Sequence, residues 1–290
     1  MNRLRSECIT CLIDSQVKKI PENITEEERV QYLQNIFRIL ADASMETSAP
    51  VIVWKINQMK DRLFHLKDDY TEVKKYFNQI MMDVEDEITE NISKSECPLK
   101  LAIQYSMVGN YIDFGAMEHV DEKYLLSQLA KAQEIQVDST AFKNLENDLA
   151  KGENFVLLTD NCGEVVMDKL LVEEIKREFP HLAITVIVRG EDVLNDATMV
   201  DAEQIGLTDI VKVVGNGTGI AGTCLEEISE EASKIIADAD VILSKGQGNF
   251  ETLRKCGLNV YYAFLCKCDM FAHNFDVPKF TGMLINDKDC

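Results

Sequence analysis

The chain has 290 residues and a formal net charge of −20, with 30 Lys and Arg against 50 Asp and Glu. This acidic excess argues against binding to a phosphate backbone, so no nucleic-acid partner is expected. We find neither the roughly 20 apolar residues of a membrane span nor an apolar signal core, so no membrane partner and no secretion are expected. Nine cysteines at uneven spacings are typical of reduced thiols, and we predict a cytoplasmic location.

The first half of the chain predicts helices. Apolar residues recur at helical spacing between residues 4 and 15, and Thr25 with Glu28 has the pattern of a capping box before a second helix. Pro50 and Pro98 are each expected in the first turn of a further helix. Additional helices are expected over residues 71–92, 122–134 and 139–151.

After residue 150, short β-branched segments alternate with amphipathic ones. Because helices that alternate with strands form right-handed βαβ units, this order predicts the α/β class, with a Rossmann-like αβα sandwich around a mostly parallel sheet. We therefore divide the chain into an all-helical N-terminal region, 1–150, and a Rossmann-like αβα domain, 151–290. The expected strands are Phe155–Thr159, Ile184–Val188, Ile210–Val214, Val241–Ser244 and Val260–Leu265.

Three of these strands end in polar segments that contain glycine, namely Asp160–Glu164, Arg189–Asp196 and Lys245–Glu251. Ligands bind outside the carboxyl ends of the strands in an open parallel sheet. Asp160 and Asn161, joined by Asp196, would form a set of hard oxygen donors that suits Mg²⁺ or Mn²⁺ beside a substrate phosphate. The alternative is that Asp160 and Asn161 only cap the helix that follows.

Lys245 precedes a glycine-rich segment at the expected start of a helix. Backbone N–H groups at such a start can surround an anion, and the lysine adds a positive charge suited to phosphate. The alternative is a simple tight turn with a solvated lysine. Both interpretations stay open on the residues alone.

Two other hypotheses come from separate patterns. Gly217–Gly222 matches the dinucleotide fingerprint, although no acidic residue ends the next strand and Thr223 replaces the lysine of a P-loop. This pattern makes a nucleotide- or nicotinamide-binding oxidoreductase the second hypothesis. The third is a non-enzymatic protein that binds zinc or another soft metal through cysteines, with buried or unreactive thiols as the alternative. The cysteines concerned are Cys8, Cys11, Cys97, Cys266 and Cys268.

Taken together, the motifs resemble the metal-dependent damage-control phosphatases, long catalogued as a domain of unknown function, and in particular their small prokaryotic branch. The resemblance covers most of the chain. It departs from the usual pattern at Asp192, where proline is common, and in the loop Gly219–Thr223, which bears on substrate preference. The matching segments are the CxxC at Cys8, Gly109–Phe114, Asp160–Glu164 with Asp168 and Lys169, Arg189–Thr198 and Lys245–Glu251.

This resemblance implies a phosphatase that hydrolyses small phosphorylated metabolites, such as sugar phosphates or damaged phosphates, with water activated by a divalent metal (Mn²⁺, Co²⁺, Ni²⁺ or Mg²⁺). It implies that Asp160, Asn161 and Asp196 hold the metal and that Lys245 grips the phosphate; these four are the expected catalytic residues. Glu164 and Glu251 either assist proton transfer or stabilise a helix start. No oligomeric state is indicated. The expected substrate contacts are Asn110, Asp113, Gly163, Glu164, Arg189, Gly246, Gln247, Gly248, Asn249 and Glu251.

Overall fold

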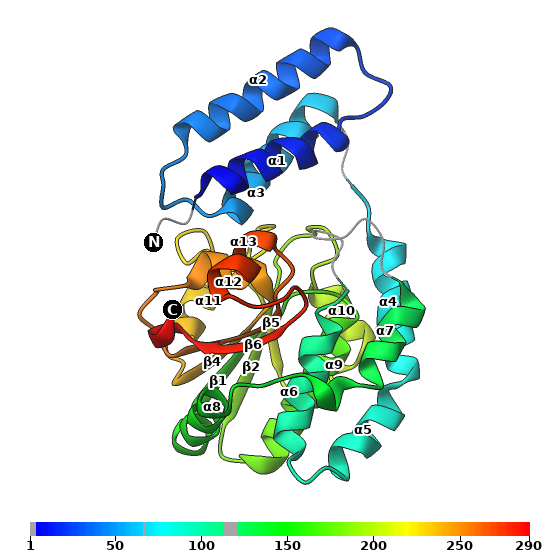
Figure 1. Cartoon of the computed structure of the whole chain (residues 1–290), viewed down its shortest axis with the longest axis vertical. Coiled ribbons are helices and arrows are strands. Elements are labelled where there is room, and N and C mark those ends of the chain that lie inside the picture. The colour runs from blue at the N-terminus through cyan, green and yellow to red at the C-terminus, as the bar shows by residue number, and fades with distance from the viewer. Residues whose placement is uncertain (1–3, 66–67, 113–120) are drawn as a thin grey trace. The chain divides into compact units, whose positions relative to one another are not determined.

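The computed structural model describes residues 4–65, 68–112 and 121–290. The chain forms two compact units, Met1–Asp69 and Tyr70–Cys290, which we call the N-terminal unit and the sheet unit. The N-terminal unit contains α1 (Ser6–Lys18), α2 (Glu26–Asp42) and α3 (Ala49–Phe64), which pack around a core that includes Tyr32 and Ile56 (Figure 1). The capping box of α2 and the proline in the first turn of α3 confirm the two predicted helix starts.

The sheet unit is built on six strands in the order β3-β2-β1-β4-β5-β6. Neighbours among the first five strands run parallel, and β6 pairs antiparallel with β5. The predicted α/β fold with a mostly parallel sheet is therefore confirmed. The strands are β1 (Asn154–Leu158), β2 (Ala183–Val188), β3 (Lys212–Gly215), β4 (Val241–Lys245), β5 (Val260–Leu265) and β6 (Gly282–Asn286).

Helices cover both faces of the sheet (Figure 1). Side chains alternate along β1, so Phe155 and Leu157 join one apolar cluster while Val156 and Leu158 join another. The first cluster packs against α4 (Thr71–Asp83), α5 (Glu85–Ser93), α6 (Pro98–Gly109), α7 (Glu122–Leu129), α8 (Ser139–Lys151), α9 (Glu164–Glu178) and α10 (Met199–Gln204). The second packs against α11 (Glu230–Ala237), α12 (Gly246–Leu253) and α13 (Asp269–Phe275).

The contacts of the chain divide it after Asp69 rather than at the predicted position 150. The physical reason is a shared core, because Phe77, Ile103 and Leu145 from the helical half pack in one cluster with Phe155 and Leu157 of β1. Helices α4 to α8 therefore belong to the sheet unit. The helix predicted over residues 71–92 divides at Val84 into α4 and α5, and the one predicted over 122–134 ends as an α-helix at Leu129.

Across the described ranges of the chain, no helix combines the length and the apolar character that a membrane crossing requires. The cytoplasmic location stays a prediction. All nine cysteines lie within the described ranges, and none of them forms a disulfide.

Candidate functional site

The loops that follow β1 and β2 meet at the carboxyl edge of the sheet. The Ala197 N–H donates a hydrogen bond to the carbonyl oxygen of Asp160 over 2.7 Å, and the Arg189 N–H donates to the carbonyl oxygen of Ala197 over 2.9 Å. An isolated antiparallel bridge also joins Asn161 to Asp196. The backbone thus brings together the three residues that the sequence predicts as metal ligands.

Arg189 lies between the two carboxylates of this site. Its Nε donates to Asp196 Oδ2 over 2.6 Å, and its Nη2 is 3.5 Å from Asp160 Oδ1. The arginine is only 1% exposed, so these charges interact with little screening by water. The sequence predicted Arg189 as a substrate contact, whereas in the structure its guanidinium bonds to the carboxylates of Asp160 and Asp196.

Two asparagine amides fix the orientation of the first carboxylate. Asn161 Nδ2 donates to Asp160 Oδ2 over 2.7 Å and to Glu164 Oε2 over 2.9 Å. Because both amide hydrogens of Asn161 point to carboxylates, its Oδ1 faces away from them. Asn110 Nδ2 donates to the same two oxygens over 2.9 Å each, while its Oδ1 accepts from the Leu265 N–H over 3.1 Å.

Asn110 is completely buried, with all of its side-chain polar atoms bonded to protein. Asn110 therefore orients Asp160 from within the protein, and its role as a substrate contact stays a prediction. Asp113, another of the expected substrate contacts, lies outside the described residues.

The site can be tested for its fit to a divalent cation. Asp160 and Asp196 supply carboxylate oxygens and Asn161 an amide oxygen, the hard donors that Mg²⁺ and Mn²⁺ prefer. Two carboxylates against one guanidinium leave a net negative charge, which a cation would offset. Among the described residues no group of three or more His, Cys, Asp or Glu is placed to hold a metal ion, so the amide of Asn161 is needed to complete three protein ligands. With that amide, the residues present fit the cation.

Lys245 does not face this oxygen-donor set with a solvated ammonium group. Its side chain is 0% exposed, and Nζ donates to Glu164 Oε1 over 2.5 Å, to Asp168 Oδ1 over 2.9 Å and to the Ser106 carbonyl oxygen over 3.1 Å. Burial lowers the pKa of the Lys245 ammonium, but the Asp168 and Glu164 carboxylates raise it by more, so the net pKa is above the usual value of a lysine. A phosphate bound to this ammonium would have to replace one of three protein acceptors.

The first turn of α12 lies directly against Asp160. Gly246 has a φ of +79°, and a Cβ atom at this position would lie 2.0 Å from Asp160 Oδ2. The first N–H groups of a helix have no partner within the helix and carry partial positive charge, so this end of α12 favours anions. A Cβ on Gly248 would lie 2.1 Å from the Ala221 carbonyl oxygen, so Gly248 admits a neighbouring loop.

Gly163 and Gln247, two further predicted substrate contacts, bond to protein groups. The Gly163 N–H donates to Asn78 Oδ1 over 2.6 Å, which ties the start of α9 to α4. Gln247 Oε1 accepts from the backbone N–H groups of Lys267 and Cys268 over 2.8 and 3.2 Å. These contacts connect the loops of the site to one another.

Asn249 and Glu251 lie further along α12. Asn249 is fully buried, with Nδ2 donating to the Thr159 carbonyl oxygen over 3.0 Å and Oδ1 lying 3.3 Å from Arg189 Nη1. Glu251 is half-buried, and burial raises its pKa to about 7 against the opposing effect of Arg254. Asn249 therefore supports the site through Arg189.

The glycine pattern at Gly217–Gly222 has a packing explanation. A Cβ on Gly190 would lie 2.2 Å from the backbone nitrogen of Gly217, so the loops after β2 and β3 touch at two glycines. The dinucleotide fingerprint requires the glycines to open a helix, but α11 begins only at Glu230. The structural context that the oxidoreductase hypothesis needs is therefore not found at this loop.

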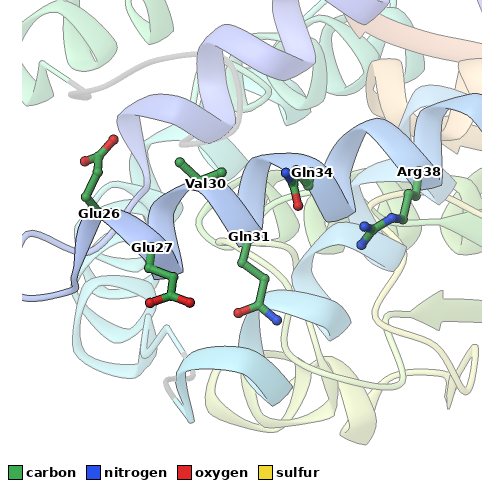
Figure 2. Close-up of a pocket in the computed structure, with 6 residues that line it drawn as sticks. All are labelled: Glu26, Glu27, Val30, Gln31, Gln34 and Arg38. Carbon is green, nitrogen blue, oxygen red and sulfur yellow. The ribbon is translucent and has the colours of Figure 1, made fainter.

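The cysteine hypothesis receives no support from the described residues, because none of their Cys, His, Asp and Glu side chains gather in threes around a possible metal position. A hollow on the surface of the N-terminal unit is no better candidate for an active site. It runs along one helix, α2, and its side chains do not converge on a common point (Figure 2). The lining residues are Glu26, Glu27, Val30, Gln31, Gln34 and Arg38.

Sequence reasoning missed the buried partners of the site. Asp168 lies four residues after Glu164 on α9, and both are 0% exposed. Two carboxylates at this spacing on a helix with apolar neighbours are a signal that could have predicted a buried cation between them. Ser106 and Asn78 gave no comparable signal.

The fold and the site together define an αβα protein with a set of oxygen donors, which two loops bring together at the carboxyl edge of a mostly parallel sheet. Residues 4–281 match the family described as the damage-control phosphatase ARMT1-like domain. The chain belongs to this family, as the resemblance of its motifs predicted.

Several archaeal proteins are similar to the chain over nearly their whole length. A damage-control phosphatase of Pyrococcus horikoshii is 30% identical, covering 99% of each chain, and one of Archaeoglobus fulgidus is 30% identical, covering 93% of this chain and 94% of the relative. An uncharacterized protein of Methanocaldococcus jannaschii is 31% identical, covering 98% and 95%. The crystal structure of a DUF89 family protein from Pyrococcus horikoshii superposes with a TM-score of 0.82 at 27% identity, covering 99% of both chains.

Proposed function

We propose that this chain is a metal-dependent phosphatase that hydrolyses small phosphorylated metabolites, such as sugar phosphates or damaged phosphates. The observation that carries the proposal is the convergence of Asp160 and Asp196, from two separate loops, on one buried arginine. Membership of the damage-control phosphatase ARMT1-like family supports phosphate ester hydrolysis as the class of reaction. Two of its relatives are named as such enzymes.

The residues of the site would have different roles in phosphomonoester hydrolysis. Asp160, Asn161 and Asp196 would hold a divalent cation, which supplies polarisation of a phosphoryl oxygen and of the attacking water. Asp160 or Asp196 would orient that water in line with the leaving oxygen. The N–H groups at the start of α12 would bind the remaining phosphoryl oxygens, because they lie beside Asp160 and have no partner within the helix.

The test is a phosphatase screen over sugar phosphates and phosphorylated cofactors with Mn²⁺, Co²⁺, Ni²⁺ and Mg²⁺. We expect hydrolysis to need a divalent metal, and we expect Asp160→Ala and Asp196→Ala each to lower kcat/KM by about 100- to 1,000-fold. Asp240→Ala is the matched control, because this aspartate accepts hydrogen bonds from the N–H groups of Glu153 and Asn154 at the opposite edge of the sheet. Equal hydrolysis by wild type, Asp160→Ala and Asp196→Ala would refute the proposal.

A further inference from the structure

A second ion cluster lies beneath the oxygen-donor set, and we call it the Lys245 cluster. It consists of Lys245 at the end of β4, Glu164 and Asp168 on α9, and Ser106 on α6. The three charged residues are 0% exposed and Ser106 is 1% exposed. A charged group this deeply buried is stable only when other polar groups compensate it, so the arrangement calls for an explanation.

The contacts within the cluster fix the position of the ammonium group. Nζ of Lys245 has one acceptor each from Glu164, Asp168 and Ser106, which matches its three hydrogens. Asp168 Oδ1 also accepts from the Ser106 hydroxyl over 2.6 Å. Asp168 Oδ2 is buried and has no hydrogen-bond partner within the described residues, so Asp168 acts through Oδ1 alone.

Glu164 connects this cluster to the oxygen-donor set, because its two carboxylate oxygens serve different partners. Oε1 accepts from Lys245, whereas Oε2 accepts from Asn161 Nδ2 over 2.9 Å and from the Asn161 backbone N–H over 3.3 Å. Asn161 Nδ2 in turn donates to Asp160 Oδ2. An unbroken path of hydrogen bonds therefore runs from the lysine through Glu164 and Asn161 to Asp160.

This geometry separates two roles for Lys245. A phosphate-binding lysine needs at least one hydrogen directed at the ligand, but all three hydrogens are matched by protein acceptors. Removing Glu164 or Asp168 from the ammonium to admit a phosphate would leave a buried carboxylate without its cation, which is strongly unfavourable. The same contacts are well suited to hold Glu164 rigidly.

We infer that Lys245 is a positioning residue, which holds Glu164 so that Glu164 fixes the Asn161 amide with Oδ1 towards the cation, and that it does not grip the substrate phosphate. This inference rests on the proposed function, since it presumes the cation site at Asp160, Asn161 and Asp196. Asp168 and Ser106 complete the support by holding Lys245. Groups that orient metal ligands in this way typically change metal affinity by about 10- to 100-fold when they are removed.

The test measures cation binding and phosphate binding separately. Mn²⁺ affinity is followed by electron paramagnetic resonance on metal-free protein, and affinity for inorganic phosphate by calorimetry on protein saturated with Mn²⁺. The variants are Lys245→Met, Glu164→Gln and Asp168→Asn. Lys169→Met is the matched control, because Lys169 is a buried lysine of α9 that is bound to Glu85 and to the Ile205 carbonyl oxygen, outside the hydrogen-bond path.

Lys245→Met and Glu164→Gln should each weaken Mn²⁺ binding by about 10- to 100-fold, with phosphate affinity at saturating Mn²⁺ changed by less than about threefold. Asp168→Asn keeps the oxygen that accepts from Lys245 and Ser106, and its amide nitrogen replaces Oδ2, which has no partner among the described residues. Its loss of Mn²⁺ affinity should therefore be smaller than that of Lys245→Met or Glu164→Gln. Lys169→Met should lower thermal stability without changing Mn²⁺ affinity. If Lys245→Met does not fold, Glu164→Gln decides the question.

Three outcomes would overturn the inference in different ways. Wild-type Mn²⁺ affinity together with a tenfold or larger loss of phosphate affinity in Lys245→Met would show a direct phosphate contact and leave the proposed function standing. Wild-type Mn²⁺ affinity in Glu164→Gln would likewise refute positioning through Glu164. Absence of Mn²⁺ binding by the wild-type protein would instead refute the proposed function, and the inference with it.

Discussion

Two buried cations lie at the carboxyl edge of the sheet on either side of β1, Arg189 after β2 and Lys245 at the end of β4, and they have different surroundings. Arg189 bonds to Asp160 and Asp196, the carboxylates of the proposed cation site. Lys245 bonds to Glu164 and Asp168, which lie on α9. On β4, Leu243 joins the apolar cluster of α6 and α9, and Lys245 is directed to the same face. Two cations at strand ends of one sheet therefore have different partners, since Lys245 is directed to the face that α6 and α9 cover.

The largest effect on this arrangement should come from Gly246→Ala. A Cβ atom would lie 2.0 Å from Asp160 Oδ2, so the carboxylate that Arg189 holds would have to move. We expect kcat/KM and Mn²⁺ affinity to fall by about 100-fold or more. Losses of this size are typical when an enzyme loses one group that stabilises charge in the transition state.

Gly257→Ala is the control for backbone strain in that experiment. Gly257 has a φ of +81°, close to the +79° of Gly246, but no heavy atom of the described residues lies within 4 Å of its Cβ position. Both variants should lose stability because alanine rarely adopts this conformation. Only Gly246→Ala should lose activity, and equal losses in both would contradict the contact with Asp160.

Arg189→Met should distinguish the two cations through the response to metal. Removing one partner of a buried ion pair costs about 3–5 kcal/mol, so Arg189→Met and Lys245→Met should both be destabilised. Added Mn²⁺ should raise the melting temperature of Arg189→Met by more than that of Lys245→Met, because a bound cation can compensate Asp160 and Asp196 but not the enclosed Asp168. Equal responses in thermal melts would contradict this separation.

Asn110→Ala tests the side-chain amide that bonds both to Asp160 of the oxygen-donor set and to Glu164 of the Lys245 cluster. The variant loses the hydrogen bonds to Asp160 Oδ2 and Glu164 Oε2, so Mn²⁺ affinity should fall by about tenfold. KM for substrate at saturating Mn²⁺ should stay near the wild-type value, since Asn110 is 0% exposed. Gln104→Ala is the control, because Gln104 lies in α6, which ends just before Asn110, and bonds to the carbonyl oxygens of Gln133 and Ile135. A rise in KM without a change in Mn²⁺ affinity would show that Asn110 contacts substrate.

The smallest expected effect is a change in stability at Glu251, a residue of α12 that belongs neither to the oxygen-donor set nor to the Lys245 cluster. Its pKa of about 7 exceeds 4.5, the ordinary value, so the folded chain binds this proton more tightly than the unfolded chain. That contribution to stability is complete below the ordinary value and is lost as the pH rises through about 7. Glu251→Gln should therefore gain about 2–4 °C in melting temperature relative to wild type between about pH 6 and about pH 8.

Glu227→Gln removes the same charge from an exposed side chain and so separates the effect of burial from that of net charge. A melting-temperature difference between Glu251→Gln and wild type that does not change with pH would contradict the expectation.

Local patterns in the sequence were sufficient for much of the fold. The capping box at Thr25 and the alternation of apolar segments depend on neighbouring residues, and these elements are found where they were predicted. The rule that ligands gather at the carboxyl edge also identified Asp160, Asn161 and Asp196 as neighbours. The boundary predicted at residue 150 overlooked a non-local contact, the core shared by Leu145 and Phe155. The burial of Asn110 against Asp160 is likewise non-local, so local patterns gave no signal of it.

The short strand β6 was missed because its pairing with β5 is a tertiary contact with little local signal. The surroundings of Lys245 were missed for a related reason. Its partners come from α6 and α9, which are far from Lys245 in the sequence. A lysine followed by glycines predicts a phosphate contact, and this local pattern is the same whether the lysine is buried or solvated.

The most direct test of the central claim is anomalous diffraction from crystals grown with Mn²⁺. The account predicts one strong anomalous peak within coordination distance of oxygens from Asp160, Asn161 and Asp196, with Lys245 still bound to Glu164. A peak elsewhere, or none at this place in protein saturated with Mn²⁺, would contradict it.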